Sequence, residues 1–292
     1  MTILVTGATG NVGTQLVPQL IRRGAHVRAF VRDPAKAKLP AGISLAQGEM
    51  LDVDSLRAAL TDVSTLFLLN AGVPDEFTQA LIVLNLARDA GIKRIFYFSV
   101  IHSDIYVDVP HFSAKHAVER MIERTGLAAT ILRPAYFINN DANVKDVILN
   151  QGVYPMPVGD KGLAMVDVRD IGEIAAIELL KREQSPVPLP FERFNLVGPD
   201  VLTGSAIARI WSEVLGRQIV HAGNDTAAFE QTVRNFAAAW QAYDLRKMAD
   251  RYQSDGMIPA AGDVERLTGI LGRPLRSYRD FAAELVAQKK ND

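Results

Sequence analysis

The first 135 residues alternate short apolar runs with longer segments in which apolar residues recur every three or four positions. Short runs rich in Val, Ile, Leu and Phe are typical of buried strands, and the longer spaced pattern is typical of helices that cover a sheet. Their alternation indicates βαβ units around a parallel sheet. The predicted strands are 3–6, 26–32, 44–50, 65–70, 94–100 and 128–134.

Helical periodicity fills the intervals between these strands. A Rossmann-type, doubly wound α/β fold follows, because parallel strands need helical crossovers and those helices cover both faces of the sheet. The predicted helices are 12–24, 53–63, 77–91 and 112–125.

The rhythm of strand and helix changes after residue 136, where prolines and glycines become frequent. Residues 165–182 predict a short strand and a long amphipathic helix that packs back on the sheet. The tail from 203 onward is mostly helical in pattern. We therefore expect a nucleotide-binding domain over 1–150, joined by 165–182, and a smaller, mostly helical substrate-binding region over 151–292.

Composition excludes several classes of protein and of site. The 292 residues carry 32 basic and 33 acidic side chains, a balance that does not favour direct nucleic-acid binding. There is no cysteine, which excludes disulfides, zinc–thiolate sites and a cysteine nucleophile. The five histidines are not spaced like metal ligands, so no metal is expected. The N-terminus does not resemble a secretory signal, and no apolar run is long enough to span a membrane. These features predict a soluble cytoplasmic protein, either monomer or homodimer, that acts on a small molecule.

The stretch TGATGNVG stands directly between the first predicted strand and the first predicted helix. Glycines in this context permit a tight turn, a close approach to a pyrophosphate and close packing of helix on strand. The helix N-terminus adds N–H groups and a partial positive charge. A glycine turn without a ligand is the structural alternative. The loop is therefore expected to bind a dinucleotide cofactor. The loop residues expected to contact it are Thr6, Gly7, Thr9, Gly10, Asn11, Val12 and Gly13.

The end of the second strand bears on the choice between NAD and NADP. Arg32 stands where an acidic residue would bind the ribose 2′-hydroxyl, and a guanidinium can hold a 2′-phosphate through two hydrogen bonds. Lys36 adds a second positive charge, so NADP(H) is favoured over NAD(H). The alternative is that both are surface charges and that Asp33 binds a ribose. Asp52, after the third strand, is expected near the adenine or as a helix cap, and both roles are compatible.

Several stretches of the sequence together resemble the NmrA-like family of atypical short-chain dehydrogenases. They are GATGNVG, VRDP, GEMLDVDSL, FSAKHAVERMIERTGLAATILRPAYF, VDVRDIGEIAA and GDVERLTGILGRPLRSYRDFAAE, and they cover nearly the whole chain. The resemblance implies NADP(H) bound on a Rossmann domain. It implies either a reductase of quinones, dyes or phenylpropanoid ethers, or a regulator that senses the cofactor.

The resemblance also points to a reacting end of the cofactor site. The family's phenylalanine-x-x-lysine helix start falls on Phe112 and Lys115, which implies that Lys115 lies near the nicotinamide. Ordinary short-chain dehydrogenases have a tyrosine four residues before this lysine, and here the residue is His111. Histidine titrates near neutral pH and can donate a proton, but it can equally be a loop residue bonded to backbone or solvent. Ser99, at the end of the fifth strand, is the third predicted catalytic residue and a predicted cofactor contact, with capping of a turn as the alternative.

Other predicted contacts follow the strands of the sheet or lie in the proline-rich loop. An apolar, aromatic-lined pocket is one interpretation of these residues, and a core that joins the two parts of the chain is the other. The predicted cofactor contacts among them are Leu69, Asn70, Pro134, Tyr136 and Phe137. The predicted substrate contacts are His102, Tyr136, Asn139, Tyr154 and Met156.

The leading hypothesis is an NADPH-dependent reductase of a small aromatic or quinone-like acceptor. The alternative is a non-catalytic NADP(H)-binding redox sensor that regulates a partner. An epimerase or dehydratase of nucleotide sugars is disfavoured, because those relatives need the tyrosine that His111 replaces.

Overall fold

The computed structural model describes residues 1–289, and the chain divides into two compact units. Unit 1 comprises 1–103, 111–133 and 168–194, and unit 2 comprises 104–110, 134–167 and the chain from 195 onward. The division departs from the expected boundary at 150, since residues 134–150 belong to unit 2. Within residues 1–289, no helix combines the length and apolar character that crossing a membrane requires.

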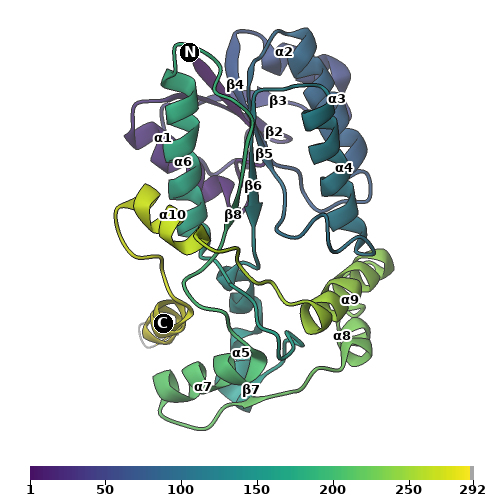
Figure 1. Ribbon diagram of the computed structural model, residues 1–292, viewed down its shortest axis with the longest axis vertical. Coiled ribbons are helices and arrows are strands. Elements are labelled where there is room, and N and C mark those ends of the chain that lie inside the picture. The colour runs from purple at the N-terminus through teal and green to yellow at the C-terminus, as the bar shows by residue number, and fades with distance from the viewer. Residues whose placement is uncertain (290–292) are drawn as a thin grey trace. The chain divides into compact units, whose positions relative to one another are not determined.

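A seven-stranded sheet with the order β3-β2-β1-β4-β5-β6-β8 forms the centre of unit 1 (Figure 1). The neighbouring strands from β3 to β6 pair in parallel, which is the doubly wound Rossmann arrangement that the sequence predicts. The strands are β1 (Thr2–Val5), β2 (His26–Val31), β3 (Ser44–Gln47), β4 (Val63–Leu68), β5 (Arg94–Phe98), β6 (Ala129–Pro134) and β8 (Glu192–Leu196), the last of which crosses the boundary between the units.

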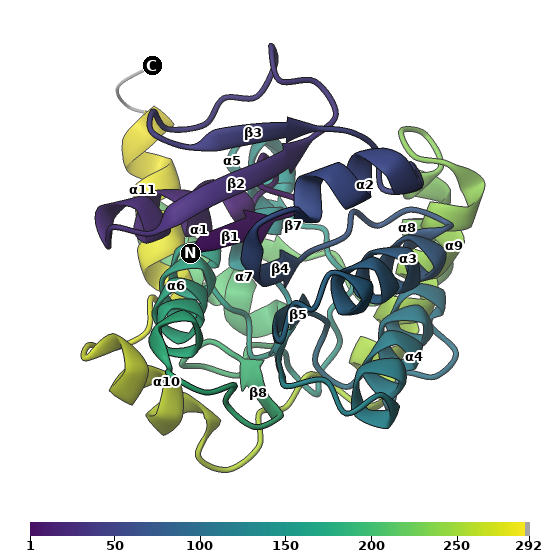
Figure 2. The same ribbon diagram turned by 90° about the horizontal axis from the view of Figure 1, so that it is seen from above.

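Helices cover both faces of this sheet. Figure 2 shows α1 and α6 on one face and α2, α3 and α4 on the other. The helix α6 packs against α1, where a Cβ on Gly172 would lie only 2.6 Å from the Cβ of Gln15, so glycine permits the close approach. The return of the chain predicted over 165–182 is thus present. The helices of unit 1 are α1 (Gly13–Arg22), α2 (Val53–Leu60), α3 (Glu76–Asp89), α4 (Pro110–Arg124) and α6 (Val168–Gln184).

An apolar core lies between the sheet and the helices α2, α3 and α4. Leu66 and Leu68 of β4 and Ile95 of β5 are fully buried in it, together with Leu56 of α2 and Val83 of α3. Strands buried on both faces have nearly continuous apolar sequences, which is why most strands of unit 1 could be predicted from the sequence.

Three element predictions require correction. The strand predicted over 44–50 ends at Gln47, and the chain enters a turn at Met50. β4 begins at Val63, earlier than predicted, because α2 already ends at Leu60. The short strand predicted at 165 is only an isolated bridge between Val166 and Phe137. The strand β8 was not predicted, since its sequence ERFNL is mostly polar.

Unit 2 is mainly helical and has a buried carboxylate at its centre. Asp141 accepts hydrogen bonds from the hydroxyls of Tyr136 at 2.6 Å, Tyr154 at 3.0 Å and Tyr278 at 2.6 Å. Burial raises the pKa of Asp141, although the three hydroxyls oppose that effect. The elements are the 3₁₀ helix η1 (Ile138–Val144), the helices α5 (Lys145–Gln151), α7 (Gly204–Leu215), α8 (Thr226–Val233), α9 (Ala239–Ser254), α10 (Asp263–Leu271) and α11 (Tyr278–Lys289), and the paired strands β7 (Val153–Tyr154) and β9 (Val220–His221).

Candidate functional site

The glycine loop joins β1 to α1 at the carboxyl edge of the sheet. Gly7 has a φ of +66°, and a Cβ there would lie 2.2 Å from the Cδ2 of Leu69. A Cβ on Gly13 would lie 2.2 Å from the carbonyl oxygen of Gly7. Sterics within the chain therefore require glycine at both positions.

Gly10 differs from these two glycines. Its backbone N–H closes a turn on the carbonyl oxygen of Gly7 at 3.1 Å, and a Cβ on it would make only an ordinary contact with that oxygen at 3.4 Å. Thr9, Gly10 and Asn11 are all exposed. The protein itself therefore has room for a larger residue at Gly10, and the missing side chain leaves open surface for a ligand that approaches the backbone closely.

The start of α1 is suited to an anion. It has no acidic residue in its first turn, and its N-cap residue is Val12, whose side chain makes no capping hydrogen bond. Helix N-termini present N–H groups and a partial positive charge, which favour a phosphate or pyrophosphate.

Thr6 and Asn70 connect the ends of β1 and β4. The Thr6 hydroxyl donates to the Leu69 carbonyl oxygen at 2.9 Å and accepts the Leu69 N–H at 2.8 Å, so it fixes the loop from within. The Nδ2 of Asn70 donates to Gln79 at 3.4 Å, but its buried Oδ1 has no hydrogen-bond partner among the described residues 1–289. Buried acceptors are normally satisfied, so this oxygen suits an N–H or O–H of a ligand.

The end of β2 distinguishes the two predicted ribose contacts. Arg32 is exposed directly after the strand. The carboxylate of Asp33 accepts the Ala35 N–H at 3.0 Å and pairs with Lys36 at 3.2 Å, so both of its oxygens stabilise the following turn. This arrangement favours Arg32 over Asp33 as the residue that meets the ribose.

Asp52 is the N-cap of α2. Its side chain accepts the N–H groups of Asp54 at 3.1 Å and Ser55 at 3.3 Å. The hydrogen bonds from Ser55 lower the pKa of Asp52 more than any other cause. The structural alternative is therefore present, and the contact with adenine stays a prediction.

The helix α4 carries both residues predicted to act near the nicotinamide. It begins at Pro110, two residues before the predicted start, so His111 lies in its first turn. His111 and Lys115 are four residues apart and therefore on the same side of the helix. The Nζ of Lys115 lies 3.6 Å from Oε2 of Glu76, with 13% of the lysine side chain and 6% of the glutamate side chain exposed.

A second buried carboxylate organises the end of β5. Glu119 of α4 is fully buried and accepts hydrogen bonds from Nε of Arg133 at 2.9 Å and Nη2 of the same arginine at 2.5 Å. It also accepts the hydroxyls of Ser99 at 2.5 Å and Ser103 at 3.3 Å. Ser99 therefore directs its hydroxyl at Glu119, which holds the loop 99–103 in place. Within that loop, His102 has a φ of 57°.

The residues predicted beyond β6 lie in unit 2. Tyr136 and Tyr154 are buried and bond to Asp141, which favours the core interpretation for both. The carbonyl oxygen of Met156 lies 3.0 Å from Nε2 of His221. The contacts predicted for Pro134, Phe137 and Asn139 stay predictions.

Glu76 and Glu119 were missed because acidic residues on helices are usually solvated. One signal was available for Glu119. It stands between Val118 and Ile122, which are both buried, so it lies next to the apolar face of α4. Glu76 follows the loop after β4, where side chains gather at the carboxyl edge.

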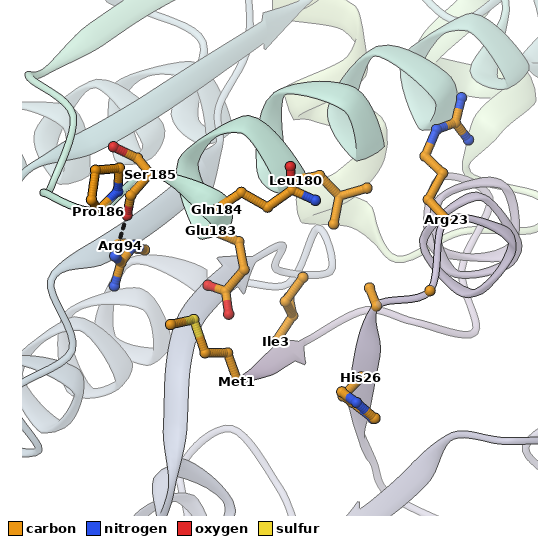
Figure 3. Close-up of a pocket in the computed structure, with 12 residues that line it drawn as sticks. Met1, Ile3, Arg23, His26, Arg94, Leu180, Glu183, Gln184, Ser185 and Pro186 are labelled. Atoms are coloured by element: carbon orange, nitrogen blue, oxygen red, sulfur yellow. Dashed lines mark hydrogen bonds between the residues drawn. The ribbon is translucent and has the colours of Figure 1, made fainter.

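A hollow of about 320 Å³ lies at the opposite, amino-terminal edge of the sheet (Figure 3). Glu183 contributes to its wall and accepts the hydroxyls of Ser64, at 2.6 Å, and Thr65. Arg94 donates to the Ser185 carbonyl oxygen at 2.8 Å. Parallel α/β sheets bind ligands at the carboxyl ends of their strands, so the hollow is not favoured as the functional site.

Comparison with known proteins matches residues 1–281 to the model of the NmrA-like family. The chain belongs to the NmrA-like family. Its NmrA-like relatives include the NAD(P)H azoreductase of Xenophilus azovorans, 27% identical over 96% of each chain. Quinone oxidoreductase 2 of Escherichia coli (strain K12) is 26% identical over 97% of this chain and 98% of the relative. The NADPH complex of the NADPH-dependent quinone oxidoreductase from Escherichia coli superposes with a TM-score of 0.86 at 24% identity, covering 97% of this chain and 99% of the other, which supports the fold.

Proposed function

We propose that this protein is an NADPH-dependent reductase of a small aromatic or quinone-like acceptor. The observation that carries the proposal is the placement of Lys115 on the helix that follows β5, at the carboxyl edge where the glycine loop also opens. Such an edge binds a dinucleotide, and a cation beside it is suited to stabilise negative charge on a reduced acceptor.

The residues at this edge fit NADP(H). The exposed turn at Gly10 and the N-terminus of α1 suit the pyrophosphate. Arg32 suits the 2′-phosphate, because a guanidinium can bind phosphate through two parallel hydrogen bonds. The unsatisfied Oδ1 of Asn70 suits a donor group of the cofactor.

When bound, NADPH supplies the hydride that reduces the acceptor. Lys115 stabilises the oxyanion that forms on the acceptor, and its burial strengthens that interaction. His111 donates the proton for acceptors that need one. A hydroquinone anion also takes its proton from solvent, so turnover of quinones depends less on His111.

The named relatives support the class of acceptor. One is named for azo reduction with NAD(P)H and another for quinone reduction, and each aligns over almost the full length of this chain. Azo compounds and quinones are both conjugated acceptors, which agrees with a reductase of broad aromatic substrates.

The experiment is steady-state oxidation of NADPH against quinones, azo dyes and aromatic carbonyls, with Lys115→Ala and His111→Phe beside the wild type. We expect Lys115→Ala to lower kcat about a hundredfold or more with quinones and aromatic carbonyls, since removing one oxyanion donor has effects of that order. Azo dyes form a nitrogen anion instead of an oxyanion, so their kcat should fall less. His111→Phe should lower kcat mainly for carbonyls, by about tenfold to a hundredfold.

Two exposed residues at the amino-terminal edge provide matched controls, Lys93→Ala and His26→Phe, and both variants should keep wild-type rates. Tight NADPH binding by the wild type without turnover of any acceptor would contradict the reductase and support the sensor. Unchanged rates in Lys115→Ala would remove the lysine from the mechanism.

A further inference from the structure

The ion pair between Glu76 and Lys115 joins two helices that follow neighbouring strands. Glu76 is the first residue of α3, which follows β4, and Lys115 is on α4, which follows β5. Only 6% of the glutamate side chain and 13% of the lysine side chain are exposed. The pair is thus a nearly buried contact at the edge where ligands bind in such sheets.

Burial makes each of these charges dependent on a nearby charge of opposite sign. An ammonium group in a poorly solvated site is unfavourable without a counter-ion, and a carboxylate is equally so. The long and flexible lysine side chain has many rotamers, and attraction to a fixed carboxylate selects the few that bring Nζ towards it. Glu76 therefore determines where the charge of Lys115 resides.

The length of the contact leaves the lysine able to act. The separation of 3.6 Å exceeds that of a normal hydrogen bond between charged groups. The carboxylate attracts and orients the ammonium without a short hydrogen bond. A second acceptor, such as a ribose hydroxyl or a developing oxyanion, can then take hydrogen bonds from the same nitrogen, which has three donors.

Two other buried carboxylates of unit 1 are held differently. Glu119 binds Arg133 through two short hydrogen bonds, and Glu183 accepts two hydroxyls at the amino-terminal edge. Both fix parts of the scaffold. Glu76 instead pairs with the residue that the family motif places beside the nicotinamide.

We infer that Glu76 is a positioning residue that holds Lys115 towards the bound cofactor and acceptor. The inference rests on the proposed function, because it assigns Glu76 a role through Lys115. It predicts that Glu76 affects NADPH binding and turnover only while Lys115 is present.

A double-mutant cycle tests this dependence, with NADPH affinity measured by fluorescence titration of the intact protein. The variants are Glu76→Gln, Lys115→Met and the double variant. Glu76→Gln alone should weaken NADPH binding about fivefold to tenfold, and it should weaken it no further in the Lys115→Met background. The kcat with a quinone should show the same non-additivity, and Glu76→Asp should restore part of both parameters because it keeps the charge.

Glu183→Gln is the matched control, since it neutralises a buried carboxylate of the same unit at the opposite edge. It should lower the melting temperature while NADPH affinity and kcat stay unchanged. Additive effects of Glu76→Gln and Lys115→Met on NADPH affinity would overturn the inference, as would wild-type affinity in Glu76→Gln.

The reductase activity and the positioning role of Glu76 can be contradicted independently of each other. If the wild type binds NADPH but reduces no acceptor, the reductase is contradicted and the affinity cycle still decides the role of Glu76. If the wild type turns over and the cycle is additive, the reductase stands and the positioning role is wrong.

Discussion

The amino-terminal and carboxyl edges of the sheet in unit 1 carry the same kinds of side chain, but these side chains have different roles at the two edges. At the amino-terminal edge, Glu183 and Arg94 bond to hydroxyls and carbonyls that the surrounding strands and helix supply. At the carboxyl edge, Asn70 keeps a buried oxygen that has no hydrogen-bond partner in the part of the chain that the structure describes, and the turn at Gly10 is exposed. The first edge has polar groups satisfied by the fold, and the second has groups suited to a ligand.

This difference matters because a hollow by itself does not identify a functional site. The hollow of about 320 Å³ lies at the amino-terminal edge, yet Glu183 and Arg94 in its wall already have partners there. At the carboxyl edge, sterics require glycine at Gly7 and Gly13 but not at Gly10. The ion pair between Glu76 and Lys115 lies at the same edge. Variants at the two edges should therefore change different properties.

The largest expected effect is the loss of cofactor binding in two glycine variants. Gly13→Ala forces a Cβ against the Gly7 carbonyl oxygen, so both stability and NADPH binding should fall. Gly10→Ala has room within the chain and should keep its melting temperature while NADPH affinity falls about tenfold to a hundredfold, a loss of roughly 1.4 to 2.7 kcal/mol. Calorimetry and fluorescence titration separate the two properties. Wild-type affinity in Gly10→Ala would mean that no ligand approaches this turn.

The opposite result is expected at the amino-terminal edge. Glu183→Ala removes the acceptor of the buried Thr65 hydroxyl, whereas the Ser64 hydroxyl keeps the Thr2 carbonyl oxygen at 3.1 Å. The variant should destabilise the protein by about 1 to 2 kcal/mol. Urea denaturation measures this loss, and the kcat and KM for NADPH should stay at wild-type values below the transition. A selective rise in KM for NADPH would indicate that the amino-terminal edge takes part in binding.

The smallest effect concerns Asp141 of unit 2, a buried carboxylate held by hydroxyls instead of cations. Burial raises its pKa above the reference value of 3.8, so the folded state retains a proton that the unfolded state releases as pH rises through that value. The contribution of Asp141 to stability therefore decreases from acid pH upward until its raised pKa is passed. Asp141→Asn removes this dependence.

Thermal unfolding of both proteins between about pH 4 and about pH 7 measures the difference. The wild type should lose stability relative to Asp141→Asn over this range, by about 1.4 kcal/mol for each unit by which the pKa is raised. A constant difference between the two proteins would show that Asp141 titrates as in the unfolded chain.

The sequence was most informative where local constraints decide the structure. The glycine loop and the presence of strands β1 to β6 were predictable, because glycine spacing and buried strands leave direct marks on the pattern. The strand β8 was not predicted, since only Phe194 and Leu196 of its five residues are apolar.

The polar interior of the site depended on tertiary contacts and could not be predicted. Glu76 and Glu119 look like solvated helix residues until the neighbouring strands bring Lys115 and Arg133 to them. The sequence left Tyr154 open between a pocket and a core, and in the structure its hydroxyl bonds to Asp141 in the core of unit 2. Contacts between two buried polar side chains leave no periodic pattern in the sequence.

The most direct test is the initial rate of NADPH oxidation by the wild-type protein with and without a simple benzoquinone, measured beside NADH. We expect NADPH oxidation that depends on both the enzyme and the quinone, with kcat/KM at least about tenfold higher than for NADH, as the proposed contact of Arg32 with the 2′-phosphate requires. NADPH that binds but is never oxidised, or equal kcat/KM for the two cofactors, would contradict this expectation.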